Sequence, residues 1–312
     1  MKKLIILVIL VFISGCSFNG DYVFELKEVD SEGYYEAYFC QVEDCESVLV
    51  NLIEGSSKVR CAIFDLDLEN VTNALKQKDY KLVVDQKNTK DLDGLKYVMN
   101  KGESQLMHNK FCIFDDKIVW TGSMNPTGRR AYYNDNHIVI FYSKEIAQVF
   151  NDEFNELYGR TFGWGRSVNV PSFNLSGTKV QVHFCPEDFC EETVLDLIEN
   201  ANEIRFMTFS FTSDKIGDAL LLKEDVKGVF EKSQASQEWS EYHKLKDKFD
   251  VRLDTNGYNM HHKVFIFDKK IVVFGSYNPT DNGNLYNDEN MIVVYDEELA
   301  KQFLEEFERI YF

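Results

Sequence analysis

The chain has 312 residues, of which 44% are hydrophobic and 14% aromatic, which is typical of a globular protein with a well-buried core and not of a disordered one. Its formal net charge is -18, so it lacks the broad basic surface of a protein that binds duplex nucleic acid nonspecifically. Because a cleft can still be locally positive, nucleic acid remains a weaker candidate substrate.

The first residues resemble an export signal. Two lysines precede an apolar run from Leu4 to Ile13, which is too short for a comfortable membrane span. The ending Ile13-Ser14-Gly15-Cys16 resembles a lipoprotein cleavage site, so we expect residues 1–20 to be a signal peptide and tether with Cys16 lipidated. An uncleaved N-terminal anchor is the alternative. Both predict an exported chain, anchored on the extracytoplasmic side of the cell membrane.

An internal repeat predicts two similar domains. Phe39–Glu46 parallels Phe184–Glu191, and each copy is followed by an amphipathic helix, a strand, a helix, a strand and another helix. A final apolar helix closes each half, near Ile146–Leu157 and Leu299–Tyr311. The alternation indicates an α/β fold, with a first domain at 21–160, a linker at 161–178 and a second domain at 179–312. The second half carries eight extra residues, placed around Ser233 to Glu241.

Six cysteines follow Cys16. Outside the cytoplasm we expect one local disulfide in each half, Cys40 with Cys45 and Cys185 with Cys190. A zinc site made by these four thiols is the alternative, although zinc ligands are usually spaced more tightly. Cys61 and Cys112 lie in apolar, strand-like runs and are interpreted as core residues.

The chemistry is concentrated in a repeated motif. His108-Asn109-Lys110 with Asp115 returns as His261-His262-Lys263 with Asp268, and Gly122-Ser123-Met124-Asn125 returns as Gly275-Ser276-Tyr277-Asn278. Each copy predicts a β-hairpin, with strands at Lys110–Phe114 and Ile118–Thr121 and at Lys263–Phe267 and Ile271–Phe274. His and Lys two residues apart on a strand project from one face, so both can reach one ligand.

Two histidines and two lysines suit attack on a phosphodiester. The lysines Lys110 and Lys263 can bind the nonbridging oxygens, and Asn125 and Asn278 can add hydrogen bonds. One imidazole can attack phosphorus while the other protonates the leaving alkoxide. No cofactor and no metal are required by this scheme.

These motifs resemble the phospholipase D superfamily over residues 34–312. The resemblance implies two α-β-α sandwich halves related by a pseudo-twofold axis, with the active site at their interface and a phosphohistidine intermediate. A chain with both motifs needs no partner to complete the site, so a monomer is expected. It also implies that the residue 28 positions after each histidine supports an imidazole; these residues are Asn136 and Glu289. We expected Glu289 to raise the pKa of His261, making His261 the general acid and His108 the neutral nucleophile.

Other polar residues of the motif receive lesser roles. Asp115 and Asp268 complete the catalytic motif and are expected to hold the hairpin turns, and Ser123 and Ser276 are expected to support the site through hydrogen bonds. His262 should point to the opposite face and pack. The pair Arg129-Arg130 is either a contact to the substrate phosphate or headgroup, or a solvated basic pair.

Three hypotheses for the substrate remain open. The first is a phospholipase D or cardiolipin hydrolase, favoured by the expected membrane tether. The second is an extracytoplasmic nuclease, disfavoured by the acidic charge and by the lack of a basic groove with interleaved aromatics. The third is a noncatalytic envelope protein that binds phosphate-bearing polymers.

Overall fold

The computed structural model describes residues 28–312 except 88, 90–91, 103–104, 129 and 169–171. The expected signal peptide, the expected lipidation site Cys16 and Arg129 therefore lie outside the described residues. Within the described ranges, no helix has the length and apolar character needed to cross a bilayer.

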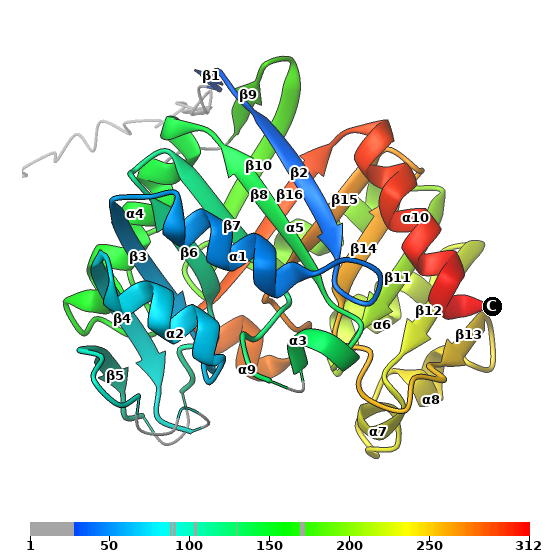
Figure 1. Ribbon diagram of the computed structural model, residues 1–312. Helices are drawn as coiled ribbons and strands as arrows, with labels where there is room; N and C mark the ends of the chain where they lie inside the picture. Colours follow the sequence, from blue (N-terminus) through cyan, green and yellow to red (C-terminus); the bar gives the residue numbers. More distant parts are fainter. Residues whose placement is uncertain (1–27, 88, 90–91, 103–104, 129, 169–171) are drawn as a thin grey trace, which may run out of the picture.

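The first half is built on a seven-stranded sheet, ordered β2-β8-β7-β6-β3-β4-β5. Its strands are β2 (Tyr34–Phe39), β3 (Lys58–Ile63), β4 (Asp79–Asp85), β5 (Val98–Asn100), β6 (Lys110–Phe114), β7 (Ile118–Gly122) and β8 (His137–Tyr142). Its helices are α1 (Cys45–Glu54), α2 (Glu69–Lys76), α3 (Arg130–Tyr133) and α4 (Lys144–Tyr158). In Figure 1, α1 and α2 cover the near face of this sheet.

The second half is built on a nine-stranded sheet, ordered β1-β9-β10-β16-β15-β14-β11-β12-β13. Its strands are β1 (Val29–Ser31), β9 (Phe173–Leu175), β10 (Thr178–Cys185), β11 (Glu203–Thr208), β12 (Asp225–Phe230), β13 (Asp250–Leu253), β14 (Lys263–Phe267), β15 (Ile271–Gly275) and β16 (Glu289–Tyr295). Its helices are α5 (Cys190–Asn200), α6 (Asp214–Leu221), α7 (Lys232–Ala235), α8 (Tyr242–Leu245), α9 (Asp281–Leu285) and α10 (Glu297–Tyr311).

The edge of the second sheet departs from the expected domain limits. β1 lies inside the expected first domain, yet it pairs in parallel with β9, which lies inside the segment expected to be a linker. The first described strand thus lies on the sheet of the second half, and the next strand, β2, lies on the sheet of the first. The β1–β9 pairing therefore links the two halves through main-chain hydrogen bonds.

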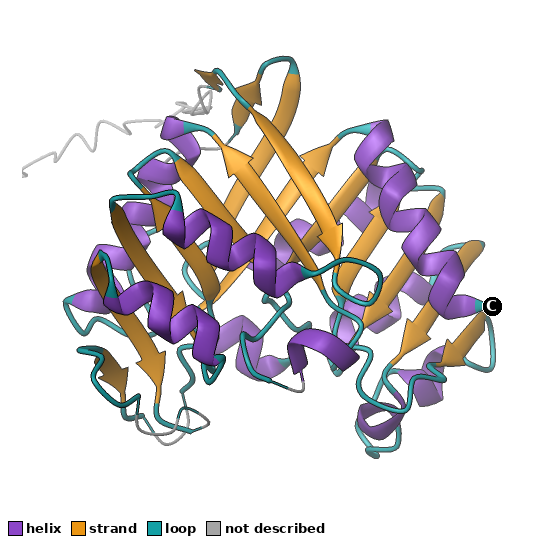
Figure 2. Ribbon diagram, in the orientation of Figure 1, coloured by secondary structure: helices purple, strands orange, loops and turns teal. Residues whose placement is uncertain are grey.

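Helices cover both faces of each sheet, which confirms the predicted α/β sandwich halves (Figure 2). α1 and α2 form one outer core with the first sheet, and α5, α6 and α8 form another with the second. A central core joins the inner faces of both sheets with α4 and α10, and in it the rings of Phe141 and Phe274 stack across the halves. Burial of this shared apolar surface holds the two halves at a fixed distance.

The closing helices begin at equivalent caps. The Ser143 hydroxyl accepts a hydrogen bond from the Ile146 amide at the start of α4, and Asp296 does the same for Leu299 at the start of α10. These caps satisfy amide groups that a helix leaves unpaired at its first turn. Both caps lie 153 residues apart, which is the spacing between His108 and His261. The repeat therefore extends from the motif to the last helix.

The hairpins agree with the predicted strands, but the helix expected before the first motif does not form in the described residues. The first half has the short strand β5 there, whereas the second half has α7 and α8 followed by β13. The additional residues around Ser233 to Glu241 account for the difference, because they include part of α7 and the turn before α8.

The cysteines pair within each half. Cys40–Cys45 and Cys185–Cys190 are disulfides, so the alternative zinc site is not formed. Cys61 and Cys112 are fully buried as expected, but they also form a third disulfide, which the sequence reading missed. They are directly opposite each other in the β3–β6 pair, a register that sequence spacing alone does not reveal.

Candidate active site

A cavity of about 390 Å³ lies between the halves, at the edge where β6 and β14 begin and β7 and β15 end. α3 and α9 border it at the lower centre of Figure 1. Equivalent residues of the two halves line it in pairs: Phe64 and Phe209, His108 and His261, and Asn125 and Asn278. The cavity is therefore nearly symmetric about the axis that relates the two motifs.

Each motif lysine folds back on its own histidine. Lys110 Nζ donates to the His108 carbonyl at 2.7 Å, and Lys263 Nζ donates to the His261 carbonyl at 2.8 Å. Both lysines are almost completely buried. A lysine ammonium has three donors, so each lysine keeps further donors for a ligand.

Two phenylalanines that sequence analysis did not single out frame these groups. Phe64 packs edge-on against the His108 ring, and its ring centroid lies 5.1 Å from Lys110 Nζ. Phe209 packs edge-on against the His261 ring in the same way, and its ring centroid lies 4.7 Å from Lys263 Nζ. Each follows an inner strand of its half, and the two lie 145 residues apart, the same spacing as between Phe39 and Phe184 of the repeat. That alignment beside the motif was the signal available in the sequence.

The imidazole partners cross between the halves, so the predicted support of each histidine by its own half is wrong. Glu289 Oε2 lies 2.7 Å from His108 Nδ1, while Asn136 Oδ1 lies 3.0 Å from His261 Nδ1. The pseudo-twofold axis brings the start of β8, with Asn136 just before it, and the start of β16, with Glu289, against the histidine of the other half. The pairing therefore depends on the packing of the domains, which the spacing of 28 residues does not specify.

The motif serines hold these partners in place. Ser276 Oγ donates to Glu289 Oε2 at 2.7 Å, and Ser123 Oγ donates to Asn136 Oδ1 at 3.0 Å. The main chain adds a second tie: His108 N donates to the Asp288 carbonyl and His261 N to the Asp135 carbonyl. Each histidine is thus fixed by the opposite half at both its backbone and its ring.

Asn125 and Asn278 remain available to a ligand. Both line the cavity, and the side-chain oxygen of each is buried with no hydrogen-bond partner among the described residues. Arg130 also lines the cavity and forms an ion pair with Asp65. Arg130 therefore belongs to the site, and its side chain is partly exposed toward solvent.

The motif aspartates lie away from the cavity, at the hairpin turns. Asp115 Oδ1 accepts from the amides of Ser57 and Lys58, and Asp268 Oδ1 accepts from the amides of Asn202 and Glu203. Each carboxylate thus ties its turn to the start of the neighbouring strand. They shape the motif without contacting a ligand in the cavity.

His262 points to the other face of its strand, as expected, into a polar network. Its ring stacks on His137, and its Nε2 lies 3.0 Å from Glu306 Oε1 on α10. Arg309 donates to both Glu306 and Asp135. This network links α10 to the backbone that holds His261.

Burial and neighbouring positive charges lower the pKa values of the two histidines and two lysines of the site. Desolvation lowers the pKa of His108 to about 4, although the Glu289 carboxylate opposes the shift. Desolvation lowers the pKa of Lys110 to about 7, and the pKa values of His261 and Lys263 lie well below their ordinary range because of burial and the neighbouring Lys110. An anionic ligand would favour the charged forms, so the cavity is suited to a phosphodiester.

This arrangement defines a class of protein: a hydrolase of phosphoric diesters, built from two motif-bearing halves around one site. The sequence model of the "Cardiolipin synthase, PLD-like domain" matches residues 51–158 and again 194–311, so the chain belongs to this PLD-like family. The predicted phospholipase D resemblance is confirmed.

Named relatives agree with that assignment. A phospholipase D of Rickettsia bellii is 35% identical over 137 residues, covering 42% of this chain and 68% of the relative. The human mitochondrial cardiolipin hydrolase is 35% identical over 108 residues, covering 33% of this chain and 43% of the relative. Among solved structures, the phosphatidylserine synthase of Haemophilus influenzae has a TM-score of 0.64 at 13% identity, covering 88% of this chain and 85% of that one, a likeness of fold. The chain is a phosphodiesterase of the phospholipase D type.

Proposed function

We propose that this protein hydrolyses phospholipids through a phosphohistidine on His108, with no metal ion at the phosphorus. The observation that carries the proposal is the cavity in which both histidines and both asparagines converge, with each motif lysine bonded to the carbonyl of its own histidine. The ammonium groups of Lys110 and Lys263 supply the positive charge that other phosphodiesterases take from metal ions.

In the first step, His108 Nε2 attacks phosphorus and the bond from phosphorus to the leaving alkoxide breaks. The proton held on His261 Nε2 passes to that alkoxide, which leaves as an alcohol. In the second step, water attacks phosphorus, His261 Nε2 takes its proton, and the phosphorus–nitrogen bond returns its electrons to His108. The phospholipid product is then phosphatidic acid.

Glu289 beside His108 and Asn136 beside His261 support the same two roles, but for a different reason from the one that the sequence suggested. His108 Nδ1–H faces the carboxylate of Glu289, which stabilises the positive charge that the ring acquires when its Nε2 is phosphorylated. His261 faces the neutral amide of Asn136 and the carbonyl of Ser123, which orient the ring without stabilising its cation. An imidazolium held in this way is the stronger acid and gives up its proton more readily.

Exposed aromatic side chains near the cavity favour a lipid surface. Tyr133 on α3 stacks on Tyr258 with ring centroids 4.6 Å apart, and Tyr286 follows α9. All three are exposed. Tyrosine is well suited to the boundary between water and lipid. We therefore extend the proposal to an exported protein whose N-terminal anchor holds this face near the membrane, with the nuclease as the alternative substrate class.

The test offers vesicles that contain cardiolipin and phosphatidylethanolamine, together with labelled single-stranded DNA, to the full-length chain in mild detergent. His108→Ala and His261→Ala are compared with His243→Ala, a histidine outside the cavity. We expect release of phosphatidic acid or its cardiolipin equivalent, lost in the first two variants and kept in the third. Cleavage of DNA with intact lipid would assign a nuclease, and lipid cleavage by His108→Ala would refute the proposed nucleophile.

A further inference from the structure

The two closing helices differ in charge at one pair of equivalent positions. On α10, Glu306 is buried, and Arg309 three residues later donates to it at 2.7 Å. On α4, the equivalents 153 positions earlier are Glu153 and Glu156. The arginine that neutralises the buried glutamate in one half is therefore replaced by a second carboxylate in the other.

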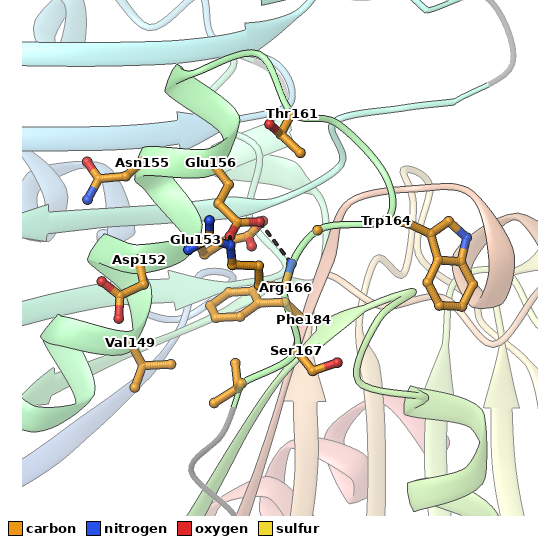
Figure 3. A pocket seen from close by; sticks show the side chains of 12 residues that line it. Val149, Asp152, Glu153, Asn155, Glu156, Thr161, Trp164, Arg166, Ser167 and Phe184 are labelled. Atoms are coloured by element: carbon orange, nitrogen blue, oxygen red, sulfur yellow. Dashed lines mark hydrogen bonds and ion pairs between the residues drawn. The ribbon is translucent and has the colours of Figure 1, made fainter.

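A third carboxylate joins this pair. Glu187, from the turn between β10 and α5, places a carboxylate oxygen so that the ligand atoms of Glu153, Glu156 and Glu187 all lie within 4.8 Å of one another. Figure 3 shows Glu153 and Glu156 on α4, facing the segment that carries Arg166, in a cavity of about 810 Å³. Three carboxylates this close repel one another strongly unless they bind protons or a cation.

The cluster lacks a positive charge of its own. Among the described residues, Glu153 and Glu187 form no ion pair, and the Arg166 side chain near Glu156 at 3.6 Å is 93% exposed, so water screens it. Glu187 is only 4% exposed, and its buried Oε2 has no hydrogen-bond partner in the part of the chain that the structure describes. An oxygen left in that state costs free energy unless a ligand satisfies it.

The backbone passes close to these oxygens at a glycine. A Cβ on Gly165 would lie 2.3 Å from Glu156 Oε2 and 2.9 Å from Glu187 Oε1. A side chain at this position would push both carboxylates aside, so the glycine lets the segment approach them as they lie. The connecting segment therefore helps to hold the two oxygens together.

The pseudo-twofold axis also relates Asp135 to Asp288. Arg309 bridges Glu306 to Asp135, whose carbonyl holds the His261 amide. On the other side, the Asp288 carbonyl accepts from the His108 amide, and its buried Oδ2 finds no hydrogen-bond partner within the described ranges. Among the described residues, no cationic side chain thus stands behind His108 where the guanidinium of Arg309 stands behind His261.

We propose that a divalent cation of the calcium type binds Glu153, Glu156 and Glu187 and neutralises this side of the molecule as Arg309 neutralises the other. Calcium takes oxygen ligands at about 2.4 Å in flexible geometry, so oxygens on opposite sides of the ion lie up to about 4.8 Å apart. Magnesium demands shorter distances and a stricter octahedron, and it fits this spread less well. The ion is structural: it supports Asp288 and the backbone of His108 from outside the cavity that binds phosphate.

Binding is measured on the full-length chain in mild detergent by calorimetry with calcium alone, and by terbium luminescence sensitised through Trp164, which lines the same cavity. The His108→Ala variant serves as a second host, so the result does not depend on activity. We expect saturable binding in both hosts and a thermal transition several degrees higher with calcium than with chelator. Trp164→Phe should lose the luminescence but keep the calcium-dependent thermal shift.

Variants distinguish calcium binding by the three glutamates from a general attraction of calcium to an acidic surface. Glu156→Gln and Glu187→Gln should weaken calcium binding at least about tenfold, whereas Asp152→Asn, an exposed carboxylate on the same helix, should leave it unchanged. Glu156→Arg restores the charge pattern of α10. It should abolish the calcium response while keeping, in chelator, a higher thermal transition than Glu156→Gln.

Two results would overturn the proposal. The first is absence of saturable calcium or terbium binding to the wild-type chain, which would mean that the carboxylates share protons instead. The second is equal loss of binding in Asp152→Asn, which would indicate diffuse attraction to an acidic surface. Neither result bears on whether His108 and His261 cleave a phosphodiester.

Discussion

The histidines of this site are distinguished by what their Nδ1 atoms face. Glu289 gives His108 a buried carboxylate at 2.7 Å, and Asn136 gives His261 a neutral amide at 3.0 Å. Both rings keep Nε2 for the substrate. The two histidines occupy equivalent positions and differ by one neighbouring charge. The carboxylate suits His108 as the nucleophile, which must carry positive charge, and the neutral amide suits His261 as the acid, which must release a proton.

Replacing the carboxylate tests this distinction. Glu289→Gln preserves the shape and one hydrogen bond but removes the negative charge beside His108, so we expect kcat to fall by roughly 10²-fold or more. Ser276→Ala is the matched control, because it removes the other hydrogen bond to Glu289 and leaves the charge. Steady-state kinetics check both; an equal loss in the two variants would assign Glu289 a purely positional role.

The pH profile follows from the lowered pKa values. Because the pKa of Lys110 is lowered to about 7, the free enzyme loses that ammonium as the pH rises above 7. Because the pKa of His108 is lowered to about 4, the nucleophile becomes protonated only below 4. We expect kcat/KM to fall below this window as His108 gains a proton and above it as Lys110 loses one, with the anionic substrate raising the pKa of His261 so that this ring keeps its proton in the complex. Lys110→Arg, which stays charged, should move the alkaline limb upward; an unchanged limb would exclude Lys110 as its source.

At the scale of single elements, the sequence predicted best those helices and strands whose own residues show a regular apolar pattern. Both hairpins follow from alternating apolar residues with a polar turn, and both closing helices follow from apolar periodicity and an N-cap. β5 was missed because three residues carry no periodicity. The Cys61–Cys112 disulfide was missed because it depends on the register of β3 against β6, and the number of residues between two cysteines does not give that register.

The disulfides should differ in their contribution to stability. Cys61–Cys112 spans 51 positions and Cys40–Cys45 spans 5. By loop-closure entropy, the longer loop stabilises the fold by about 4 kcal/mol and the shorter by about 2. Replacing both cysteines of each pair by alanine and measuring unfolding in guanidinium checks this order. An equal or greater loss from the Cys40–Cys45 variant would contradict it.

At the scale of the whole molecule, the two halves complete each other. Glu289, Asn136 and the carbonyls of Asp288 and Asp135 all act across the interface. The sequence identified most of these side chains but assigned the two imidazole partners to the wrong histidines. The correct pairing requires the position of the pseudo-twofold axis, which no local pattern contains.

Arg309 is the charged link between α10 and this interface. Arg309→Met would leave Glu306 and Asp135 buried without their cation, and we expect unfolding to become easier by about 3 kcal/mol, at the low end for buried pairs because the arginine is 37% exposed. Adding Glu306→Gln should recover part of the loss. Denaturant unfolding measures both, and full stability in Arg309→Met would show that water solvates these carboxylates.

The most direct measurement is mapping of the covalent intermediate. A phosphodiester with a nitrophenol leaving group needs little acid assistance, so in His261→Ala the adduct should form and then persist, because the base that activates water is missing. Samples denatured at alkaline pH, where the phosphorus–nitrogen bond survives, and analysed by peptide mass spectrometry should carry the adduct on His108 in His261→Ala and in the wild type, and none in His108→Ala. An adduct on His261, in the wild type or in His108→Ala, would contradict the account.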